Sequence, residues 1–150
     1  MGALSENGPC FIGHDSNSTH LNPWSWNNEA NILYVDQPTQ VGFSYDTPTN
    51  VTASLLKEQF TGFQYAAADF SDGVPDSNLT FITGTTGSQN VTYTANSTSH
   101  AAVAIWHFAQ TWFEEFPFYK PADEQISLFT ESYGGHYGPA FVSFFMRQND

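Results

Sequence analysis

The chain has 150 residues and a formal net charge of -12, with three Lys and Arg side chains against fifteen Asp and Glu. Such a surface repels a phosphate backbone, so nucleic acid is excluded as a partner. Hydrophobic residues make up 40% of the chain and aromatic residues 17%, more apolar side chain than a disordered protein carries. The length suits one domain with its own core, or one part of a larger domain.

Membrane, metal and cofactor signals are missing from the sequence. No apolar run approaches the roughly 18 to 20 residues that cross a bilayer, so no membrane partner is expected. The first ten residues have neither the basic nor the apolar region of a signal peptide. No spacing of His, Cys, Asp and Glu is typical of metal ligands, and no cofactor is predicted. Cys10 is the sole cysteine, so it can pair with no other cysteine of this chain.

Five triplets of the form Asn-X-Ser/Thr are acceptors for N-glycosylation and indicate a protein of the secretory pathway. The acceptor residues are Asn17, Asn50, Asn78, Asn90 and Asn96. A single triplet arises readily by chance in a chain rich in Asn and Thr, whereas five are harder to explain in that way. A glycoprotein without a signal peptide is expected to be a piece of a longer precursor whose missing part is N-terminal.

The first third of the chain predicts a loop followed by a strand. Residues 1–29 are rich in Gly, Pro, Asn and Ser and predict a loop. Residues 31–36 form a short apolar run that predicts a buried strand. Gln37-Pro38 stops this strand and is a candidate cis bond in a tight turn. Asp36 is expected to shape the following loop rather than to act as a catalytic acid.

The middle of the chain predicts two helices separated by a polar segment. Apolar residues at helical spacing predict a helix over about 54–71. Residues 72–98 are polar and predict a surface hairpin or insertion, with short strands at 79–83 and 90–94. A second helix is predicted over 100–116 from apolar residues spaced by three or four.

The last part of the chain predicts a strand, a tight turn and a helix around one serine. Residues 125–130 predict the strand, and a helix is expected from 139 to 147. A nucleophile elbow places a serine at such a turn among residues of very small side chain. Ser132 has this position, and the next N–H, that of Tyr133, could donate to an oxyanion at the helix N-terminus. Thr130 stands where the G-x-S-x-G motif has its first glycine, and a Gly-rich helix start around an ordinary serine is the alternative.

The run from 131 to 139, E-S-Y-G-G-H-Y-G-P, resembles the active-serine segment of the serine carboxypeptidase family, G-E-S-Y-(A or G)-G-x-Y-x-P. Further blocks agree with the family in order, at 6–9, 22–27, 30–38, 41–45 and 113–119. The resemblance therefore covers nearly the whole chain apart from 72–98. It implies the α/β-hydrolase fold, of which residues 1–150 would be a single fragment with central strands and flanking helices. The N-terminal strands and the C-terminal half would be missing.

The resemblance also implies roles for four residues. Ser132 would be the nucleophile that attacks the last peptide bond of a peptide or protein and becomes acylated. The Tyr133 N–H would be one donor to the oxyanion. Glu6 and Glu131 would recognise the C-terminal carboxylate of the substrate. Carboxylates bind another carboxylate only by sharing protons, so the resemblance implies release of C-terminal amino acids favoured at acidic pH. A secreted or vacuolar location follows, while the oligomeric state is left open.

Other parts of the family machinery are expected to lie outside the chain. The family's N-G-G-P-G motif, which supplies a second oxyanion N–H, would precede Met1. The catalytic Asp and His follow the serine at a distance in this fold, whereas His136 and Asp150 are too near the elbow. His136 is expected to pack or to form a hydrogen bond at the helix start. The polypeptide on its own is therefore expected to be inactive, and Cys10 would pair with a cysteine of the missing half.

Two alternatives stay open at this point. A catalytically silent glycoprotein module could retain the scaffold for binding. An esterase or acyltransferase could use the same scaffold, because an acyl-enzyme can pass its acyl group to acceptors other than water.

Overall fold

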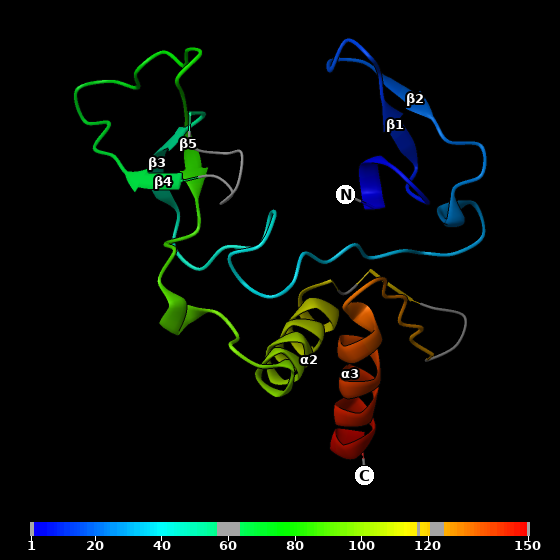
Figure 1. Ribbon diagram of the computed structural model, residues 1–150. Coiled ribbons are helices and arrows are strands. Elements are labelled where there is room, and N and C mark those ends of the chain that lie inside the picture. Colours follow the sequence, from blue (N-terminus) through cyan, green and yellow to red (C-terminus); the bar gives the residue numbers. More distant parts are fainter. Residues whose placement is uncertain (1, 57–63, 117, 121–124, 150) are drawn as a thin grey trace. The chain divides into compact units, whose positions relative to one another are not determined.

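The computed structural model describes residues 2–56, 64–116, 118–120 and 125–149 as a mixed α/β structure (Figure 1). The chain divides into two compact units, Met1–Val35 and Asp36–Asp150. The first unit contains η1 (Gly2–Leu4), β1 (Cys10–Ile12), β2 (Thr19–Leu21) and η2 (Trp26–Asn28). The second contains β3 (Thr49–Ser54), β4 (Gln64–Ala67), β5 (Phe81–Thr86), η3 (Val91–Tyr93), α2 (Thr98–Glu115) and α3 (Gly134–Asn149).

The first unit is organised around an antiparallel hairpin. Strands β1 and β2 pair with Cys10 opposite Leu21. In the turn between them, Asp15 Oδ1 accepts hydrogen bonds from the N–H of Ser18 at 2.9 Å and of Asn17 at 3.1 Å. Because these donors favour the charged carboxylate, the Ser18 N–H above all, the pKa of Asp15 is held below its usual value. The predicted loop over 1–29 thus contains a short two-stranded ribbon.

The sheet of the second unit has the order β4-β3-β5, with both pairs antiparallel. Val51 of the central strand lies opposite Ala67 on one side and Gly84 on the other. Val51 and Ala53 are buried and alternate with more exposed neighbours, which is the two-residue period of a half-buried strand. A β-branched segment with partners on both sides satisfies its backbone groups in a ladder.

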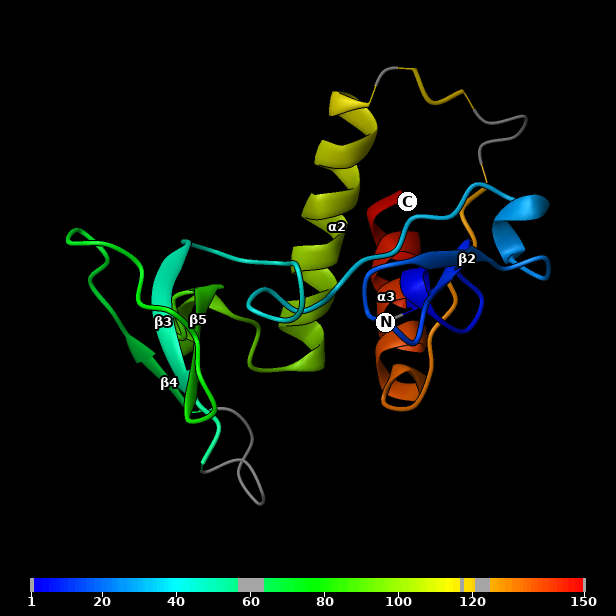
Figure 2. The same ribbon diagram turned by 90° about the horizontal axis from the view of Figure 1, so that it is seen from above.

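Helices α2 and α3 pack against each other and form the other core of this unit (Figures 1 and 2). Ser97 caps α2, since its side chain accepts a hydrogen bond from His100 N–H at 3.2 Å. Phe141 of α3 is 3% exposed and packs on Ala101 and Ala102 of α2. The small alanine side chains allow the two helices to approach closely, and the Phe141 ring packs into this contact.

Hydrogen bonds in this unit join the loop before β3 to the segment after β5. Ser88 donates to the Asp46 carboxylate from both its N–H, at 2.9 Å, and its hydroxyl. The hydroxyl bond is the main cause that holds the pKa of Asp46 far below its usual range. Gln40 Nε2 donates to Asn90 O at 2.9 Å, and Thr94 Oγ1 donates to Thr39 O at 2.6 Å. Residues 88–94 are thereby tied to residues 39–46.

Several predicted elements are confirmed. The helix predicted over 100–116 is α2, Thr98–Glu115. The helix predicted from 139 to 147 is α3, which begins five residues earlier, at Gly134. Gln37-Pro38 is cis, and Asp36 does shape its loop, because its Oδ2 accepts a hydrogen bond from Phe43 N–H at 2.8 Å.

Other predictions are wrong. The helix predicted over 54–71 is contradicted by strand β3, which ends at Ser54, and by strand β4; residues 57–63 lie outside the described part. The runs 31–36 and 125–130 belong to no sheet. A buried parallel strand requires neighbours on both edges, and no described strand pairs with either run.

The polar segment 72–98 also differs from its prediction. The strand predicted at 79–83 is found as β5, but β5 pairs with β3 rather than with the segment predicted at 90–94. That segment contains the short helix η3, whose cap Asn90 accepts from Thr92 N–H at 3.0 Å. The expected hairpin within 72–98 is therefore not formed, because β3 offers the better partner.

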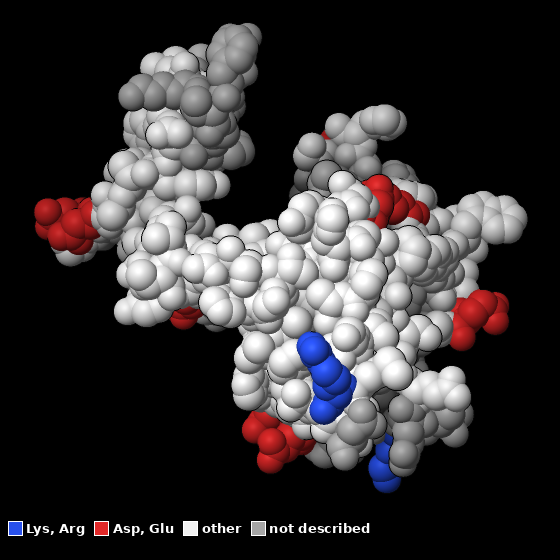
Figure 3. All heavy atoms as spheres, turned by 60° about the horizontal axis from the view of Figure 1, so that its bottom comes forward, with Lys and Arg blue, Asp and Glu red and all other residues white. Residues whose placement is uncertain are grey.

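Large apolar side chains are exposed along much of the described chain. Phe43 is 89% exposed and Trp24 is 86% exposed, and Leu79 and Phe118 are similarly open to solvent. Most of the face in Figure 3 is uncharged, and its acidic side chains lie singly or in small groups. No helix among the described residues is long and apolar enough to cross a membrane.

We expect the isolated 150-residue polypeptide to unfold without a cooperative transition. Only a few apolar side chains of the described chain are buried, so little hydrophobic free energy is gained in one step. Differential scanning calorimetry should show a broad or absent endotherm, and a dye that binds exposed apolar surface should fluoresce strongly. A sharp endotherm with equal calorimetric and van't Hoff enthalpies would contradict this expectation.

Candidate active site

Ser132 has the backbone of a nucleophile elbow. Its φ is +57°, in the left-handed region that costs a residue with a side chain about 1–3 kcal/mol. The turn is closed by Gly134 N–H donating to Glu131 O at 2.8 Å and by Gly135 N–H donating to Ser132 O at 3.0 Å. An irregular segment thus changes direction at one residue and enters helix α3, and this sharp turn leaves the Ser132 side chain exposed.

The start of α3 presents a backbone donor next to this serine. Tyr133 O accepts from His136 N–H at 2.9 Å and from Tyr137 N–H at 3.2 Å, so it is the carbonyl of the first helical turn. The Tyr133 N–H donates to no oxygen of the described residues. Unpaired N–H groups and the positive end of the helix dipole favour negative charge at this position. The arrangement can stabilise an oxyanion that forms beside Ser132.

Aromatic rings connect the turn to the helix core. The Tyr133 and Tyr137 rings lie 5.1 Å apart between centroids, and the Tyr137 and Phe141 rings 5.4 Å apart. Phe141 is the buried residue of the α2–α3 contact. On the same pair of helices, Trp106 makes an edge contact with Phe145 at 5.0 Å. The packing of α2 therefore limits the movement of the helix that carries the turn.

No described side chain serves Ser132 as a base. The Ser132 hydroxyl makes no hydrogen bond within the described part of the chain. The ring of His136 lies against that of Tyr133, with 4.9 Å between centroids, which is the packing position that the sequence predicts for it. His100 Nδ1 shares a hydrogen bond of 2.8 Å with Asn96 Oδ1.

Glu6 lies in the first unit, in a loop that Asn22 holds. The φ of Glu6 is +50°, so it too has a left-handed backbone. Asn22 is 2% exposed, and its Nδ2 donates to Glu6 O at 3.1 Å and to Gly8 O at 2.9 Å. Its Oδ1 accepts from Trp24 N–H at 3.0 Å. One buried amide thereby fixes the loop whose exposed carboxylate belongs to Glu6.

A second buried side chain supports the same loop. Ser25 is 4% exposed and donates from its hydroxyl to Asn7 O at 3.0 Å, while Trp26 N–H donates to that carbonyl at 3.2 Å. The sequence blocks 6–9 and 22–27 are therefore in direct contact. The sequence identifies both blocks but does not predict that Asn22 and Ser25 hold the loop through hydrogen bonds. The only sequence feature that could have indicated this role is an Asn and a Ser on either side of Pro23-Trp24 within a polar loop.

Glu131 lies in the second unit, next to Ser132, with its side chain exposed and its carbonyl in the turn. Cys10 is half-buried in β1 and carries a free thiol. Among the residues that the structure describes, no group of three His, Cys, Asp or Glu side chains could hold a metal ion.

All five glycosylation acceptors are exposed, but their local geometry differs. Asn78 Oδ1 accepts from Thr80 Oγ1 at 2.7 Å, and Asn90 Oδ1 accepts from Thr92 Oγ1 at 2.8 Å. Asn96 instead contacts His100. Asn50 lies within strand β3, and Asn17 donates its N–H to Asp15. In two triplets, therefore, the hydroxyl of the third residue is already bonded to the acceptor side chain.

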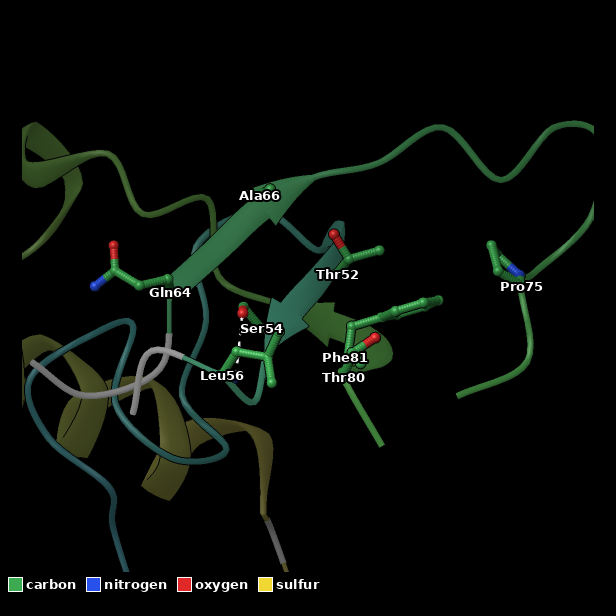
Figure 4. Close-up of a pocket in the computed structure, with 8 residues that line it drawn as sticks. All are labelled: Thr52, Ser54, Leu56, Gln64, Ala66, Pro75, Thr80 and Phe81. Carbon is green, nitrogen blue, oxygen red and sulfur yellow. Dashed lines mark hydrogen bonds between the residues drawn. The ribbon is translucent and has the colours of Figure 1, made fainter. Parts of the chain in front are cut away.

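A shallow hollow of about 440 Å³ lies over the β4-β3-β5 sheet (Figure 4). Its lining residues are Thr52, Ser54, Leu56, Gln64, Ala66, Pro75, Thr80 and Phe81. None of them is an acid or a base, and none belongs to the turn at Ser132, so the hollow offers no proton transfer to that serine.

Comparison with known proteins agrees with this local geometry. A family model described as serine carboxypeptidase matches residues 1–150. The chain belongs to the serine carboxypeptidase family, which implies the α/β-hydrolase fold. No solved structure matches the chain.

Curated relatives match along the whole chain. Carboxypeptidase S1 homolog A of Arthroderma otae is 58% identical over 150 residues, which are 100% of this chain and 22% of the relative. Carboxypeptidase Y homolog of Arthroderma benhamiae is 41% identical over 152 residues, with 100% and 23% covered. Serine carboxypeptidase-like 38 of Arabidopsis thaliana is 30% identical over 150 residues, with 100% and 23% covered. The chain spans about a fifth of the length of the curated relatives it matches.

We expect Asn22→Ala to lower the free energy of unfolding of the full-length protein by about 1–3 kcal/mol, because it leaves buried carbonyl groups and the Trp24 N–H without partners. Urea denaturation measures this loss. Asn28→Ala is the matched control, since Asn28 is exposed and makes one side-chain bond, to Pro23 O at 2.9 Å. Its effect should stay within about 0.5 kcal/mol. Equal effects of the two variants would contradict the bracing role.

Proposed function

We propose that this chain is the nucleophile-bearing part of a serine carboxypeptidase that releases C-terminal amino acids through an acyl-enzyme on Ser132. The observation that carries the proposal is the left-handed backbone of Ser132 at the entry to α3, combined with the family match over residues 1–150. A strained turn that exposes one serine hydroxyl at a helix start is the arrangement that α/β-hydrolases use for acyl transfer.

The proposed reaction begins with attack of Ser132 Oγ on the carbonyl carbon of the last peptide bond. A new C–O bond forms, and the carbonyl oxygen gains negative charge that the Tyr133 N–H stabilises. The general base takes the Ser132 hydroxyl proton during the attack and delivers it to the amine nitrogen as the carbonyl re-forms and the C–N bond breaks. The amino acid leaves, and the shortened peptide stays on Ser132 as an ester. Water hydrolyses the ester and returns the Ser132 hydroxyl. The general base that this reaction needs, with its carboxylate partner, is proposed to come from residues other than those of this chain.

Substrate recognition is assigned to Glu6 and Glu131. Both side chains are exposed. Glu6 lies in the loop that Asn22 holds, and Glu131 lies in the turn before α3. Two carboxylic groups that share a proton with the substrate's C-terminal carboxylate bind it best at acidic pH. The substrates are accordingly peptide or protein C-termini.

The larger architecture belongs to the same proposal. Residues 1–150 form one part of an α/β-hydrolase domain, with 72–98 as a surface insertion. Release to the vacuole or the cell exterior fits five exposed glycosylation acceptors. Cys10 is proposed to pair with a cysteine outside this chain. The isolated 150-residue polypeptide should show no turnover, because the Ser132 hydroxyl has no base among its described residues.

We expect Ser132→Ala in the full-length protein to lower kcat for C-terminal release by about a million-fold, because the acyl acceptor is lost. A blocked dipeptide with an aromatic leaving residue, assayed at acidic pH, gives kcat, KM and the burst of released amino acid. Ser143→Ala is the matched control, as Ser143 is an exposed serine on α3 away from the turn.

Unchanged activity of Ser132→Ala would overturn the proposal. A full-length protein that binds blocked dipeptides but never releases an amino acid would favour the silent glycoprotein module. Release that rises with an added alcohol acceptor, with a transfer product in place of the free acid, would favour an acyltransferase.

We expect glycan occupancy to be highest at Asn78 and Asn90 when the full-length protein is expressed in a secretory fungal host. In these triplets the threonine hydroxyl is already hydrogen-bonded to the acceptor side chain, whereas Asn96 contacts His100. Peptide mapping after enzymatic deglycosylation in heavy-oxygen water measures occupancy at each site. Unmodified Asn78 and Asn90 beside a fully occupied Asn96 would contradict the expectation.

A further inference from the structure

Thr130 connects the two sides of the turn that carries Ser132. Its hydroxyl donates to Gly134 O at 2.9 Å. Thr130 belongs to the segment that enters the turn, and Gly134 is the first residue of α3, which leaves it. One side-chain hydrogen bond therefore spans the left-handed residue and joins the backbone before it to the backbone after it.

The space around Thr130 exists because two helix residues lack side chains. A Cβ on residue 134 would overlap the Thr130 Cβ and lie 2.8 Å from its Oγ1. A Cβ on residue 138 would lie 2.9 Å from the same Oγ1. At Gly135, between them, a Cβ would meet nothing within 4 Å. The first turns of α3 are thus free of side chains at the two positions that face Thr130.

We infer that Thr130 is a positioning residue for Ser132, and that its bulk is matched by the bare backbone of Gly134 and Gly138. The inference rests on the proposed role of Ser132 as the nucleophile. A glycine at position 130, as in the G-x-S-x-G motif, would also let the two segments approach. Threonine adds a donor that glycine lacks, and this donor holds the turn closed on the helix.

The consequence for catalysis is geometric. Ser132 keeps a left-handed backbone that its side chain makes costly, so its surroundings must resist relaxation. Displacement of a reacting group by about 1 Å can cost on the order of a hundredfold in rate. The Thr130 hydroxyl donates to Gly134 O and not to the Ser132 hydroxyl, so its loss should lower kcat and the acyl-enzyme burst rate while KM changes little.

The first test compares two conservative variants in the full-length enzyme. Thr130→Val keeps the branched shape and removes the donor, and its kcat should fall about tenfold, the equivalent of one hydrogen bond. Thr130→Ser keeps the donor and should stay within about threefold of the parent, which corresponds to less than one such bond. A burst rate that falls with kcat in Thr130→Val at unchanged KM supports positioning. Equal kcat in both variants and the parent would overturn it.

The second test is a size-exchange cycle. Gly134→Ala should lower kcat on the order of a hundredfold, because its methyl group overlaps Thr130 and displaces the turn. The double variant Thr130→Gly with Gly134→Ala should recover at least about tenfold of this loss, because the overlap is relieved. Gly84→Ala is the matched control: it adds the same methyl group in β5, where nothing lies within 4 Å, and should leave kcat unchanged.

Thermal unfolding midpoints of the same variants test the contact without an assay. Gly134→Ala should lower the midpoint, and adding Thr130→Gly should raise it again. Absence of this recovery in both kcat and midpoint would overturn the inference, even where Ser132→Ala abolishes activity as proposed. An active Ser132→Ala variant would instead overturn the proposed function, and a midpoint cycle that still recovers would then confine Thr130 to shaping the turn.

Discussion

Two residues of the candidate site, Glu6 and Ser132, hold a left-handed backbone that their side chains make costly. In each case a polar side chain stabilises it by donating to a main-chain carbonyl. Asn22 donates to the carbonyl of Glu6 itself, and Thr130 donates to that of Gly134, across the turn at Ser132. A local strain of this kind persists only where neighbours restrict the backbone. These two hydrogen bonds, together with the main-chain bonds of the turn at Ser132 and the Ser25 bond to Asn7 O, hold the backbone that carries the Glu6 carboxylate and the Ser132 hydroxyl.

The side chains of Asn22 and Thr130, which make these two hydrogen bonds, lie in different surroundings. The amide of Asn22 is buried and bonded at both its oxygen and its nitrogen, so it forms a polar core for a unit with few buried apolar side chains. Thr130 works instead by shape as well as by hydrogen bonding, because Gly134 and Gly138 leave room for it. Behind this turn, Phe141 and the alanines of α2 supply the apolar packing that keeps α3 in place.

The sequence predicted local features better than paired ones. The helix at α2 and the turn at 131–135 follow from spacing and turn chemistry within a few residues. The start of α3 was predicted too late, because Pro139 favours a first helical turn and the glycines before it have low helix propensity. The helix predicted over 54–71 is wrong because residues 64–67 pair as β4 with β3, a long-range partner that the pattern of a single segment does not record. Likewise, the sequence does not distinguish Asn22 from other loop asparagines, because its three hydrogen-bond partners, Glu6 O, Gly8 O and Trp24 N–H, are known only from the structure.

The same distinction explains the runs 31–36 and 125–130. Both have the composition of buried strands, yet neither belongs to a sheet here, because a strand's stability comes from its neighbours. The second run leads directly into the turn at Ser132, whose geometry is nevertheless present. The contacts that close this turn are short-range and lie among residues 130 to 138. The backbone geometry of this serine is thus set within its own segment, whereas a strand depends on partners that lie far away in the sequence.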